Sequence, residues 1–358
     1  MKKIVLTGGG TAGHVTPNIA LLPALQAAGY EIAYVGSYEG IEKKLIADFN
    51  IPYTGISTGK FRRYLDPKNF SDPFRVMKGF VEARNYLKNY QPDVVFSKGG
   101  FVSVPVVRAA ASLHIPCIIH ESDMTPGLAN KLCIPVAEKV CCNFPETMKN
   151  IPADKAVLTG SPIRAELAQG SKLAGLNMCG FTANKPVIMV IGGSLGAANV
   201  NKAVRDALPK LLEDFQVVHL CGKDKIDNLL LNTPGYKQFE YIKAELKDIF
   251  AMADIVISRA GANAICELLA LKKPNILIPL PAASSRGDQL LNAASFEAQG
   301  YSIVLNEDDI TTNLLVDKVH ELYFNRQNYV DAMSKSHQMD AVKTIMELIN
   351  EAADKKTN

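Results

Sequence analysis

The sequence lacks a hydrophobic run long enough to cross a membrane, because no stretch approaches the ~18 apolar residues that a spanning helix needs. The apolar run Ile4–Leu6 gives way at once to Thr7 and three glycines, which is not the pattern of a secretory signal peptide. A strong charge excess is also missing, since the net charge is only +3 over 358 residues. We therefore expect a cytoplasmic protein with no nucleic-acid partner.

The seven cysteines lack the spacing of a metal site. They form no CxxC pair, and no histidine stands at zinc-finger spacing from them. We expect small buried hydrophobic side chains in a reducing compartment, and no structural metal.

Length and composition favour two domains. The chain of 358 residues, 47% hydrophobic and 21% charged, is too long for one ordinary core and suits two domains of roughly 150 to 180 residues. Strand-like runs alternate with amphipathic helical stretches, which predicts an α/β fold with a doubly wound parallel sheet in each half. Ligands of such sheets bind at the carboxyl ends of the strands. The predicted strands are Ile4–Leu6, Glu31–Val35, Val94–Ser97, Cys117–His120 and Lys139–Cys142 in the first half, and Val187–Ile191, Gln216–Leu220, Phe239–Ile242, Ile255–Ser258, Asn275–Ile278 and Ser302–Leu305 in the second.

The join between the halves is predicted at Thr159–Arg164, where a strand exit, a glycine and a proline come together. This gives an N-terminal domain of residues 1–163 and a C-terminal domain of residues 164–340. Residues 171–185 are predicted to be a loop before the second sheet. The tail 341–358 has helical apolar spacing, and we expect a closing helix that packs back on the first domain.

Two segments combine a strand, a glycine-rich turn and a helix start. They are KKIVLTGGGTAGHVTPN at residues 2–18 and KPVIMVIGGSLGAANVN at residues 185–201. Backbone N–H groups and a helix dipole converge at such a turn, so each loop is a candidate phosphate site. The duplication suggests two similar domains, each presenting a loop to a shared cleft.

The first loop also satisfies the dinucleotide fingerprint GxGxxG, over Gly8–Gly13. That fingerprint needs an acidic residue at the end of the second strand to bind a ribose, yet three neutral residues follow Val35 before Glu39 appears. A dinucleotide also needs one such loop, whereas this chain has two. A nicotinamide-dependent oxidoreductase is therefore the weaker alternative.

The second half carries a more unusual segment, SRAGANAICELLALKKPNILIPLP at residues 258–281. Gly261 makes a turn after a buried strand, and the helix that follows has first-turn N–H groups able to hold an anion. Glu267 lies about one turn into this helix. One interpretation is that its carboxylate only interacts favourably with the helix dipole. The other is that it accepts hydrogen bonds from the vicinal hydroxyls of a ribose.

Seven segments together resemble glycosyltransferase family 28, the peptidoglycan N-acetylglucosaminyltransferases, nearly from end to end. That family moves N-acetylglucosamine from UDP-GlcNAc to the C4 hydroxyl of MurNAc-pentapeptide on undecaprenyl diphosphate (lipid I), which gives lipid II. The resemblance implies a GT-B fold, with two Rossmann-like domains facing across a cleft. The segments are GGGTAGHVTPN (8–18), SKGGFVSVP (97–105), HESDMTPGLANK (120–131), GSPIR (160–164), GGSLGAANVN (192–201), SRAGANAICE (258–267) and DQLLNA (288–293).

The resemblance also implies where UDP-GlcNAc binds. Asp123 stands where many family members have Asn, so it cannot donate an amide hydrogen bond. The implied donor-binding residues are Thr11, Ala12 and Gly13 from the N-terminal side, Asp123, Arg164, Ser194, the diphosphate- and ribose-binding run Ala262, Asn263, Ala264, Ile265, Cys266 and Glu267, Ile242 against uracil, and Gln289 on the sugar hydroxyls.

The chemistry of an inverting transfer asks for a base that takes the proton of the acceptor hydroxyl, which is worth about 10² to 10⁴ in rate. His14 closes the first glycine loop and is the candidate catalytic residue. Its alternative roles are to bind the lipid diphosphate or to cap its helix. Glu121 or Asp123 could orient it.

In the family, the loops Lys98–Phe101 and 125–131 are assigned to the acceptor. The acceptor's diphosphate could accept hydrogen bonds from the N–H groups of Gly99 and Gly100.

No Asp-x-Asp motif is present to hold a metal ion on the departing UDP. Arg164 and the N–H groups at the Ser194 and Ala262 turns can supply positive charge instead. We expect no essential metal cofactor, while stimulation by magnesium stays open.

Residues 60–88 carry eight basic side chains against three acidic ones, with aromatic residues between them and a helix start predicted at Ser71-Asp72-Pro73. This pattern suits peripheral binding to an anionic membrane surface, on the cytoplasmic face where lipid I is used. Alternatively the aromatic residues are core and the charges form a solvated face.

The remaining alternative activity is that of another GT-B enzyme, such as a UDP-sugar epimerase or a glycolipid transferase.

Overall fold

The computed structural model describes residues 1–59, 68–192, 197–282, 287–336 and 340–357. The chain divides into two compact units. Unit 1 comprises Met1–Arg164 together with Asp340–Asn358, and unit 2 comprises Ala165–Met339. The boundary predicted from the sequence lies one residue before this division.

Unit 1 is built on a parallel sheet of strand order β3-β2-β1-β4-β5-β6-β7. The order reverses between β1 and β4, so the loops that leave these two strands diverge at the point where doubly wound sheets bind ligands. Two strands were missed by the sequence prediction: β3 is interrupted by Thr54 and Gly55, and β7 is only three residues long. The strands are β1 (Lys3–Thr7), β2 (Glu31–Ser37), β3 (Tyr53–Ile56), β4 (Val94–Ser97), β5 (Cys117–Glu121), β6 (Lys139–Cys142) and β7 (Ala156–Leu158).

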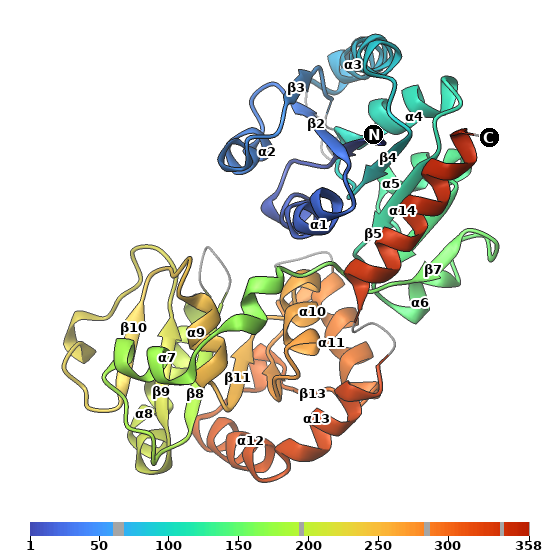
Figure 1. Cartoon of the computed structure of the whole chain (residues 1–358). Coiled ribbons are helices and arrows are strands. Elements are labelled where there is room, and N and C mark those ends of the chain that lie inside the picture. The colour runs from blue at the N-terminus through green and yellow to red at the C-terminus, as the bar shows by residue number, and fades with distance from the viewer. Residues whose placement is uncertain (60–67, 193–196, 283–286, 337–339, 358) are drawn as a thin grey trace. The chain divides into compact units, whose positions relative to one another are not determined.

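Helices cover both faces of this sheet (Figure 1). The long helix α3 already includes Lys68, so Ser71-Asp72-Pro73 does not begin it as predicted. The helices of unit 1 are the short 3₁₀ turn η1 (Ala12–His14), α1 (Thr16–Ala27), α2 (Ile41–Ile46), η2 (Ala47–Phe49), α3 (Lys68–Tyr90), α4 (Ser103–Ser112), α5 (Leu128–Cys133), η3 (Ile134–Val136), α6 (Pro145–Met148) and α14 (Ala341–Thr357).

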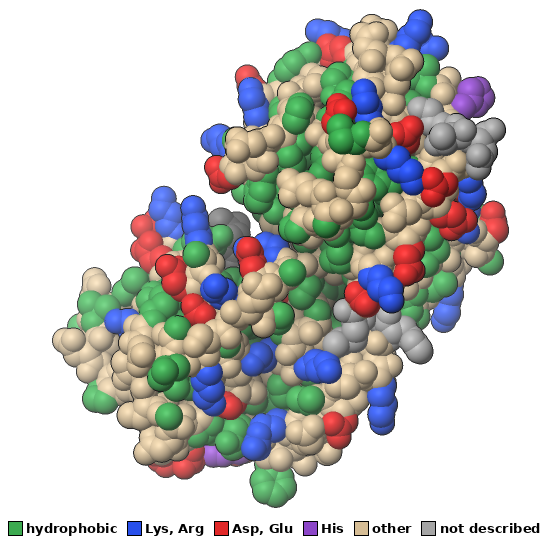
Figure 2. Space-filling view, in the orientation of Figure 1, with side chains coloured by type: hydrophobic (Ala, Val, Ile, Leu, Met, Phe, Trp, Pro, Cys, Tyr) green, Lys and Arg blue, Asp and Glu red, His purple; other side chains and the backbone are tan. Residues whose placement is uncertain are grey.

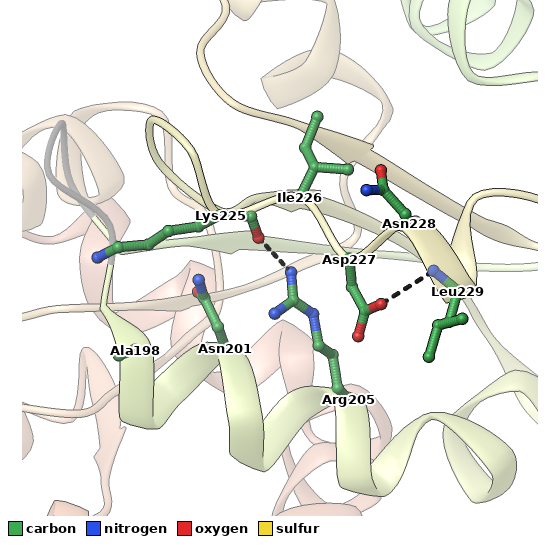
Figure 3. A pocket seen from close by; sticks show the side chains of 8 residues that line it. All are labelled: Ala198, Asn201, Arg205, Lys225, Ile226, Asp227, Asn228 and Leu229. Carbon is green, nitrogen blue, oxygen red and sulfur yellow. Dashed lines mark hydrogen bonds between the residues drawn. The ribbon is translucent and has the colours of Figure 1, made fainter.

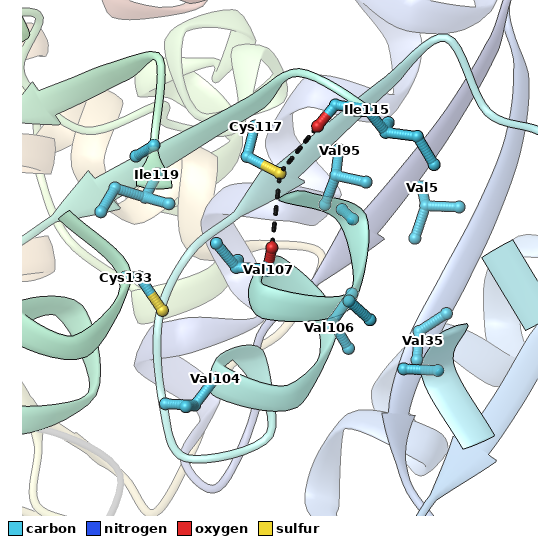
Figure 4. Close-up of a cluster of buried hydrophobic side chains, with 14 of the residues drawn as sticks. Val5, Val35, Val95, Val104, Val106, Val107, Ile115, Cys117, Ile119 and Cys133 are labelled. Atoms are coloured by element: carbon cyan, nitrogen blue, oxygen red, sulfur yellow. Dashed lines mark hydrogen bonds between the residues drawn. The ribbon is translucent and has the colours of Figure 1, made fainter. Parts of the chain in front are cut away.

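Two clusters of buried side chains hold the sheet of unit 1 to its helices. One joins the sheet to α3, α4 and α5, and in it the Cys117 thiol contacts the carbonyl oxygens of Val107 and Ile115 (Figure 4). The other joins the sheet to α1 and α14, with Ile345 and Ile349 fully buried. The chain therefore returns to unit 1 through α14, which lies alongside β5 in Figure 1.

Unit 2 is built on a second parallel sheet, of strand order β10-β9-β8-β11-β12-β13, which reverses between β8 and β11. The strand predicted at Phe239–Ile242 is displaced: β10 is Tyr236–Phe239, because this edge strand alternates buried and exposed residues and has no continuous apolar run. The strands are β8 (Val187–Ile191), β9 (Gln216–Leu220), β10, β11 (Ile255–Ser258), β12 (Asn275–Leu277) and β13 (Ser302–Val304).

The loop predicted over residues 171–185 is wrong in part, because it contains helix α7. The Ser171 side chain accepts a hydrogen bond from the Ala174 N–H and so caps this helix. The helices of unit 2 are η4 (Ala165–Gln169), α7 (Lys172–Cys179), α8 (Ala198–Asp214), η5 (Asn228–Leu230), α9 (Leu246–Met252), α10 (Ala262–Ala270), α11 (Asp288–Ala298), η7 (Glu307–Asp309), α12 (Thr312–Phe324) and α13 (Arg326–Ser334).

The seven cysteines are all buried free thiols, as expected from their spacing. Within the ranges that the structure describes, no helix is long and apolar enough to span a membrane.

Candidate active site

The first glycine loop leaves β1 and turns into η1, at the point where the sheet of unit 1 reverses. Two of its N–H groups have partners inside the protein: the Gly9 N–H donates to the Gly99 carbonyl oxygen at 3.3 Å, and the Gly10 N–H donates to Glu42 Oε2 at 3.1 Å. These two groups are not available to a phosphate. The expectation that the first loop is a phosphate cradle is therefore wrong for Gly9 and Gly10.

Glu42 is a functional candidate that sequence reasoning missed. It is fully buried in the first turn of α2, and its Oε1 also accepts the Ser37 N–H at 2.9 Å and the Ser37 hydroxyl at 2.5 Å. Burial by itself raises the pKa of Glu42, but the hydrogen bonds from Ser37 and Gly10 outweigh it, and the net pKa is lowered. A carboxylate therefore lies beneath the loop. The sequence signal that could have identified Glu42 is an acidic residue shortly after β2. The dinucleotide fingerprint instead requires the acidic residue at the end of that strand.

His14, the candidate catalytic residue, ends η1. Its Nδ1 lies 3.0 Å from Thr11 Oγ1, and its Cδ2 lies 3.7 Å from where a Cβ on Gly99 would be. Burial and the charge of Lys98 lower the pKa of His14 to about 4, against the opposing effects of the Gly9 backbone and Glu42. The imidazole is therefore neutral at pH 7, the form that accepts a proton.

The Nδ1 of His14 contacts the Thr11 hydroxyl. The Glu121 carboxylate binds the loop that follows it: its Oε1 accepts the Asp123 N–H at 2.9 Å, and its Oε2 accepts the Gly127 N–H at 3.0 Å. The Asp123 carbonyl oxygen accepts the Thr147 hydroxyl at 3.1 Å, so the backbone of Asp123 is fixed from both sides.

The turn after β4 brings Gly99 and Gly100 against the first glycine loop. Both have positive φ angles, +94° and +85°, and a Cβ on Gly100 would overlap the Gly9 carbonyl oxygen. The Gly99 N–H donates to Ser97 Oγ at 3.2 Å, so the prediction of a free Gly99 N–H is wrong. The predicted loop 125–131 ends early, since α5 begins at Leu128.

In unit 2, the turn after β11 leads into α10, whose N-terminal residue Gly261 provides no side-chain cap. The N–H groups of Ala262, Asn263 and Ala264 stand in the first turn, where no preceding helical carbonyl can accept from them. Glu267 lies half-buried on the same helix. The side chains of Ile265 and Cys266, by contrast, are buried, at 0% and 5% exposure.

Arg259 precedes this turn and was also missed from the sequence. Its Nη1 donates to the carbonyl oxygens of Ile278 and Pro279, at 3.0 and 3.2 Å, and its Nη2 forms an ion pair with Glu307. Glu307 in turn accepts the Asn199 side-chain N–H at 2.6 Å, near the start of α8. Arg259 thus ties together the segments after β11, β12 and β13 and the start of α8.

Two more contacts fix the turns around α10. Asn292 Nδ2 donates to the Ala260 carbonyl oxygen at 3.1 Å, and Gln289 Oε1 accepts the Leu280 N–H at 3.1 Å. Part of the Gln289 amide is therefore already used in the turn after β12. Ile242 is 5% exposed and follows β10, and beside it Tyr241 is 63% exposed.

The predicted residues divide between the units. Thr11, Ala12, Gly13, Asp123 and Arg164 belong to unit 1, and the other described donor residues belong to unit 2. Ser194 lies outside the described residues. Among the residues that are described, no group of three or more His, Cys, Asp or Glu side chains is arranged to hold a metal ion.

A cavity of about 480 Å³ lies in unit 2 between α8 and the segment after β9 (Figure 3). Its Arg205 points from α8 toward that segment, donating to the Lys225 carbonyl oxygen at 2.6 Å and to Gln238 Oε1 at 2.9 Å, while Asp227 accepts the Leu229 N–H at 3.0 Å. These charges therefore hold the segment in place. None of the predicted site residues lines this cavity; the lining residues are Ala198, Asn201, Arg205, Lys225, Ile226, Asp227, Asn228 and Leu229.

Comparison with known proteins gives consistent matches over both units. Residues 4–142 match the glycosyltransferase family 28 N-terminal domain, and residues 187–349 match the glycosyltransferase family 28 C-terminal domain. A protein of Lachnospira eligens is 65% identical over 351 residues, covering 98% of this chain and 99% of that protein. A protein of Clostridium botulinum is 58% identical over 349 residues, with 98% and 99% covered. Both are named UDP-N-acetylglucosamine--N-acetylmuramyl-(pentapeptide) pyrophosphoryl-undecaprenol N-acetylglucosamine transferase.

Two solved structures are similar in fold to this chain over nearly its whole length. The crystal structure of Acinetobacter baumannii MurG is 28% identical, with a TM-score of 0.77 and 98% and 100% of the two chains covered. The UDP-GlcNAc 2-epimerase of Neisseria meningitidis, bound to UDP-GlcNAc, has a TM-score of 0.70 at 15% identity over 98% and 100% of the two chains. At that identity the epimerase shares the fold alone.

Proposed function

The chain belongs to glycosyltransferase family 28, and from this premise we propose that it transfers N-acetylglucosamine from UDP-GlcNAc to the C4 hydroxyl of MurNAc-pentapeptide in lipid I. The product is lipid II, for peptidoglycan synthesis. The observation that carries this proposal is 65% identity over 98% of the chain to a protein named for that transfer. The two Rossmann-like units make the GT-B fold expected from the sequence. The epimerase alternative has only a shared fold at 15% identity in its favour.

In the proposed mechanism His14 is the base. The proton of the C4 hydroxyl passes to the imidazole as the bond from C4 oxygen to the sugar C1 forms, and UDP departs from the opposite face with the electron pair of its C1–O bond. His14 is neutral at pH 7, as this role requires. A base at Nε2 also requires the tautomer in which Nδ1 carries the proton and donates to Thr11 Oγ1, 3.0 Å away.

The departing UDP is proposed to bind at α10. Glu267 would accept hydrogen bonds from the ribose hydroxyls, and the first-turn N–H groups of α10, with Arg164, would stabilise the diphosphate. This arrangement needs no metal ion, and we propose that none is essential. Transfer should then persist in excess EDTA, with added magnesium changing the rate only as a stimulant.

Helix α3 supports a peripheral position on the membrane. Phe74, Met77 and Val81 follow helical spacing and are 78%, 63% and 52% exposed, so they form one apolar stripe. Lysine and arginine side chains lie at the α3 end of this unit in Figure 2. Phe80, in contrast, packs against the core. The exposed basic residues of α3 are Arg75, Lys78, Arg84 and Lys88, and the side chains of residues 60–73 lie outside those described.

We infer that this stripe, which we call the α3 stripe (Phe74, Met77 and Val81), binds the cytoplasmic face of the cell membrane. Basic residues contribute about 1 kcal/mol each near an anionic lipid surface, and exposed apolar side chains insert between the headgroups. Lipid I is an undecaprenyl-linked substrate, so this position would bring the enzyme to its acceptor.

The transfer is tested by incubating the purified protein with UDP-GlcNAc and a lipid I analogue and measuring the mass of the product by mass spectrometry. We expect a mass increase of one N-acetylhexosamine. The variant His14→Ala should lose turnover by at least ~10²-fold while still binding UDP. His320→Ala, which alters an exposed histidine of α12 in unit 2, is the matched control. Absence of the added hexosamine would refute the proposed activity, and full turnover in His14→Ala would refute the base.

The membrane position is tested by flotation with liposomes that do or do not contain anionic lipid. The double variant Phe74→Ser with Met77→Ser should lose most of its binding to anionic vesicles. Phe324→Ser removes another strongly exposed aromatic residue, 86% exposed, from α12 in unit 2 and should bind as the parent does. Equal binding by all three proteins would show that the α3 stripe does not face the membrane.

A further inference from the structure

Two helices of unit 2 begin at the point where its sheet reverses. The reversal lies between β8 and β11, and the segments that leave these strands lead into α8 and α10. Doubly wound sheets bind their ligands at this edge. The N-cap residues of the two helices, Ala197 and Gly261, carry no polar side chain. The spacing of the two helix starts therefore decides whether their first-turn N–H groups can serve the same anion.

Arg259 anchors the turn before α10. It follows β11 directly and is only 8% exposed. Its Nη1 donates to the carbonyl oxygens of Ile278 and Pro279 beyond β12, and its Nη2 pairs with Glu307 beyond β13. A planar guanidinium can bind acceptors on several sides at once, whereas a lysine ammonium is a compact charge on a flexible stem. The charge of Arg259 is thus paired inside unit 2.

Glu307 extends this connection to α8. Its Oε1 accepts the Asn199 side-chain N–H at 2.6 Å, and Asn199 is the second residue of that helix. The ion pair is buried, with 10% of the Arg259 side chain and 9% of the Glu307 side chain exposed, whereas Asn199 is exposed. We call the three linked side chains, Arg259, Glu307 and Asn199, the unit 2 bridge. Because charge-assisted hydrogen bonds are directional, the bridge holds the start of α8 against the turn before α10.

The carbonyl oxygens of that turn are also bonded within unit 2. The Arg259 carbonyl oxygen accepts the Ser258 hydroxyl at 2.9 Å, and the Ala260 carbonyl oxygen accepts Asn292 Nδ2 at 3.1 Å. Side-chain donors therefore offset the partial negative charge of the turn. The first-turn N–H groups of α10 lie immediately beyond it. This arrangement suits an anion at the helix start, provided that the turn keeps its place.

We propose that Arg259, Glu307 and Asn199 are positioning residues for the donor: the unit 2 bridge holds the starts of α8 and α10 at the spacing that lets both bind the diphosphate of a uridine nucleotide. This inference rests on the proposed function, in which UDP departs at α10. The three side chains act through the two helix starts and take no part in the proton transfer.

The bridge should matter for the diphosphate and not for the nucleoside. Glu267, the proposed partner of the ribose, lies further along α10. That part of the helix is held by the buried side chains of Ile265, Leu268 and Leu269, at 0%, 2% and 2% exposure. Core packing therefore keeps Glu267 in place when the bridge is cut, and the first turn alone changes its position relative to α8.

The experiment compares the binding of UDP and of uridine to the full chain, by NMR titration of backbone amide signals. Arg259→Lys keeps the charge but cannot bind both carbonyl oxygens and Glu307 together, and we expect UDP affinity to fall by about 10-fold. Asn199→Ala removes only the exposed end of the bridge and leaves the buried ion pair, and we expect a fall of about 5-fold. Uridine affinity should stay within about twofold in both.

Asn313→Ala is the matched control. It removes another exposed hydrogen bond between α8 and the segment after β13, in which Lys210 Nζ donates to Asn313 Oδ1 at 2.6 Å, farther along α8 from its start. This variant should bind UDP and uridine as the parent does. The stability of Asn199→Ala should equal that of Asn313→Ala in a denaturant titration.

The kinetic readout is the KM for each substrate. In the bridge variants the KM for UDP-GlcNAc should rise, and the KM for the lipid I analogue should stay unchanged. A merely structural role would weaken uridine and UDP alike, and that result would overturn the inference. Unchanged UDP affinity in folded Arg259→Lys or Asn199→Ala would overturn it too. If the parent binds UDP but transfers no sugar, the proposed function alone fails, and a parent that binds no UDP refutes both.

Discussion

The first glycine loop and the turn before α10 each link a central strand to a helix, yet they differ in sequence and in how their N–H groups are bonded. In the first loop, Gly9 and Gly10 donate to partners inside the protein, the Gly99 carbonyl and the Glu42 carboxylate. At α10, Gly261 offers no side-chain cap to the first-turn N–H groups of the helix. The difference teaches that glycine spacing predicts a tight turn, whereas an acidic residue elsewhere in the chain decides whether the turn suits an anion.

The buried charges of the two regions also act differently. In unit 1, burial lowers the pKa of His14, and the charges of Lys98 and Glu42 add smaller effects of opposite sign. In unit 2, Arg259 and Glu307 form an ion pair. Arg259 also donates to two backbone carbonyl oxygens, and Glu307 accepts from Asn199. The first arrangement adjusts a proton acceptor, and the second holds several turns in a fixed geometry.

The largest expected effect is on stability, from Glu42→Ala. The change leaves the buried N–H groups of Gly10 and Ser37 without their acceptor, and we expect a loss of about 4 kcal/mol in the free energy of unfolding. Glu39→Ala, on an exposed residue of the same connection, should stay within about 0.5 kcal/mol of the parent. Denaturant titration measures both. Equal stability of the two variants would contradict the assignment of Glu42 as the internal partner of the loop.

The second prediction compares one glycine from each region. Gly100→Ala places a Cβ on the Gly9 carbonyl oxygen at a positive φ, and we expect a loss of about 3 kcal/mol. Gly261 has φ −68° and nothing within 4 Å of the position of an added Cβ, so Gly261→Ala should change stability by no more than about 1 kcal/mol. Thermal unfolding compares them. Similar losses in both variants would remove the packing difference between the two turns.

The third and smallest effect concerns donor binding. Glu267→Gln weakens the acceptor for the ribose hydroxyls, and we expect UDP affinity to fall by about 10-fold, or about 1.4 kcal/mol. Glu213→Gln, on an exposed residue of α8, is the matched control, and Glu42→Gln should leave UDP affinity unchanged if the first loop is not the phosphate site. Isothermal titration calorimetry with UDP measures all three. A loss confined to Glu42→Gln would reverse the roles assigned to the two regions.

Much of the fold was predictable from local patterns. The central strands, such as β1, β4 and β11, are buried on both faces and appear as apolar runs. Edge strand β3 is interrupted by Thr54 and Gly55, β7 has only three residues, and β10 includes exposed Lys237, so two edge strands were missed and one was displaced. Helix α7 was missed because its first signal is a single capping residue, Ser171.

The candidate site was predictable only in part. His14 was found because it ends a recognisable glycine loop, but its contact with Thr11 and its lowered pKa depend on burial. Glu42 was missed because it reaches Gly10 across 32 positions of sequence. Arg259 was missed because an arginine after a strand has no local pattern that distinguishes a buried structural cation from a ligand-binding one.

The sequence by itself determined the two parallel sheets, the glycine turns at their reversal points and the family, because hydrophobic periodicity and motif order are local properties. Only the tertiary structure decided which N–H groups of those turns are already satisfied, and which charges face His14. The physical reason is that hydrogen bonding and protonation depend on the partners that burial brings together. Those partners, Glu42 and Lys98 above all, come from other segments of the chain.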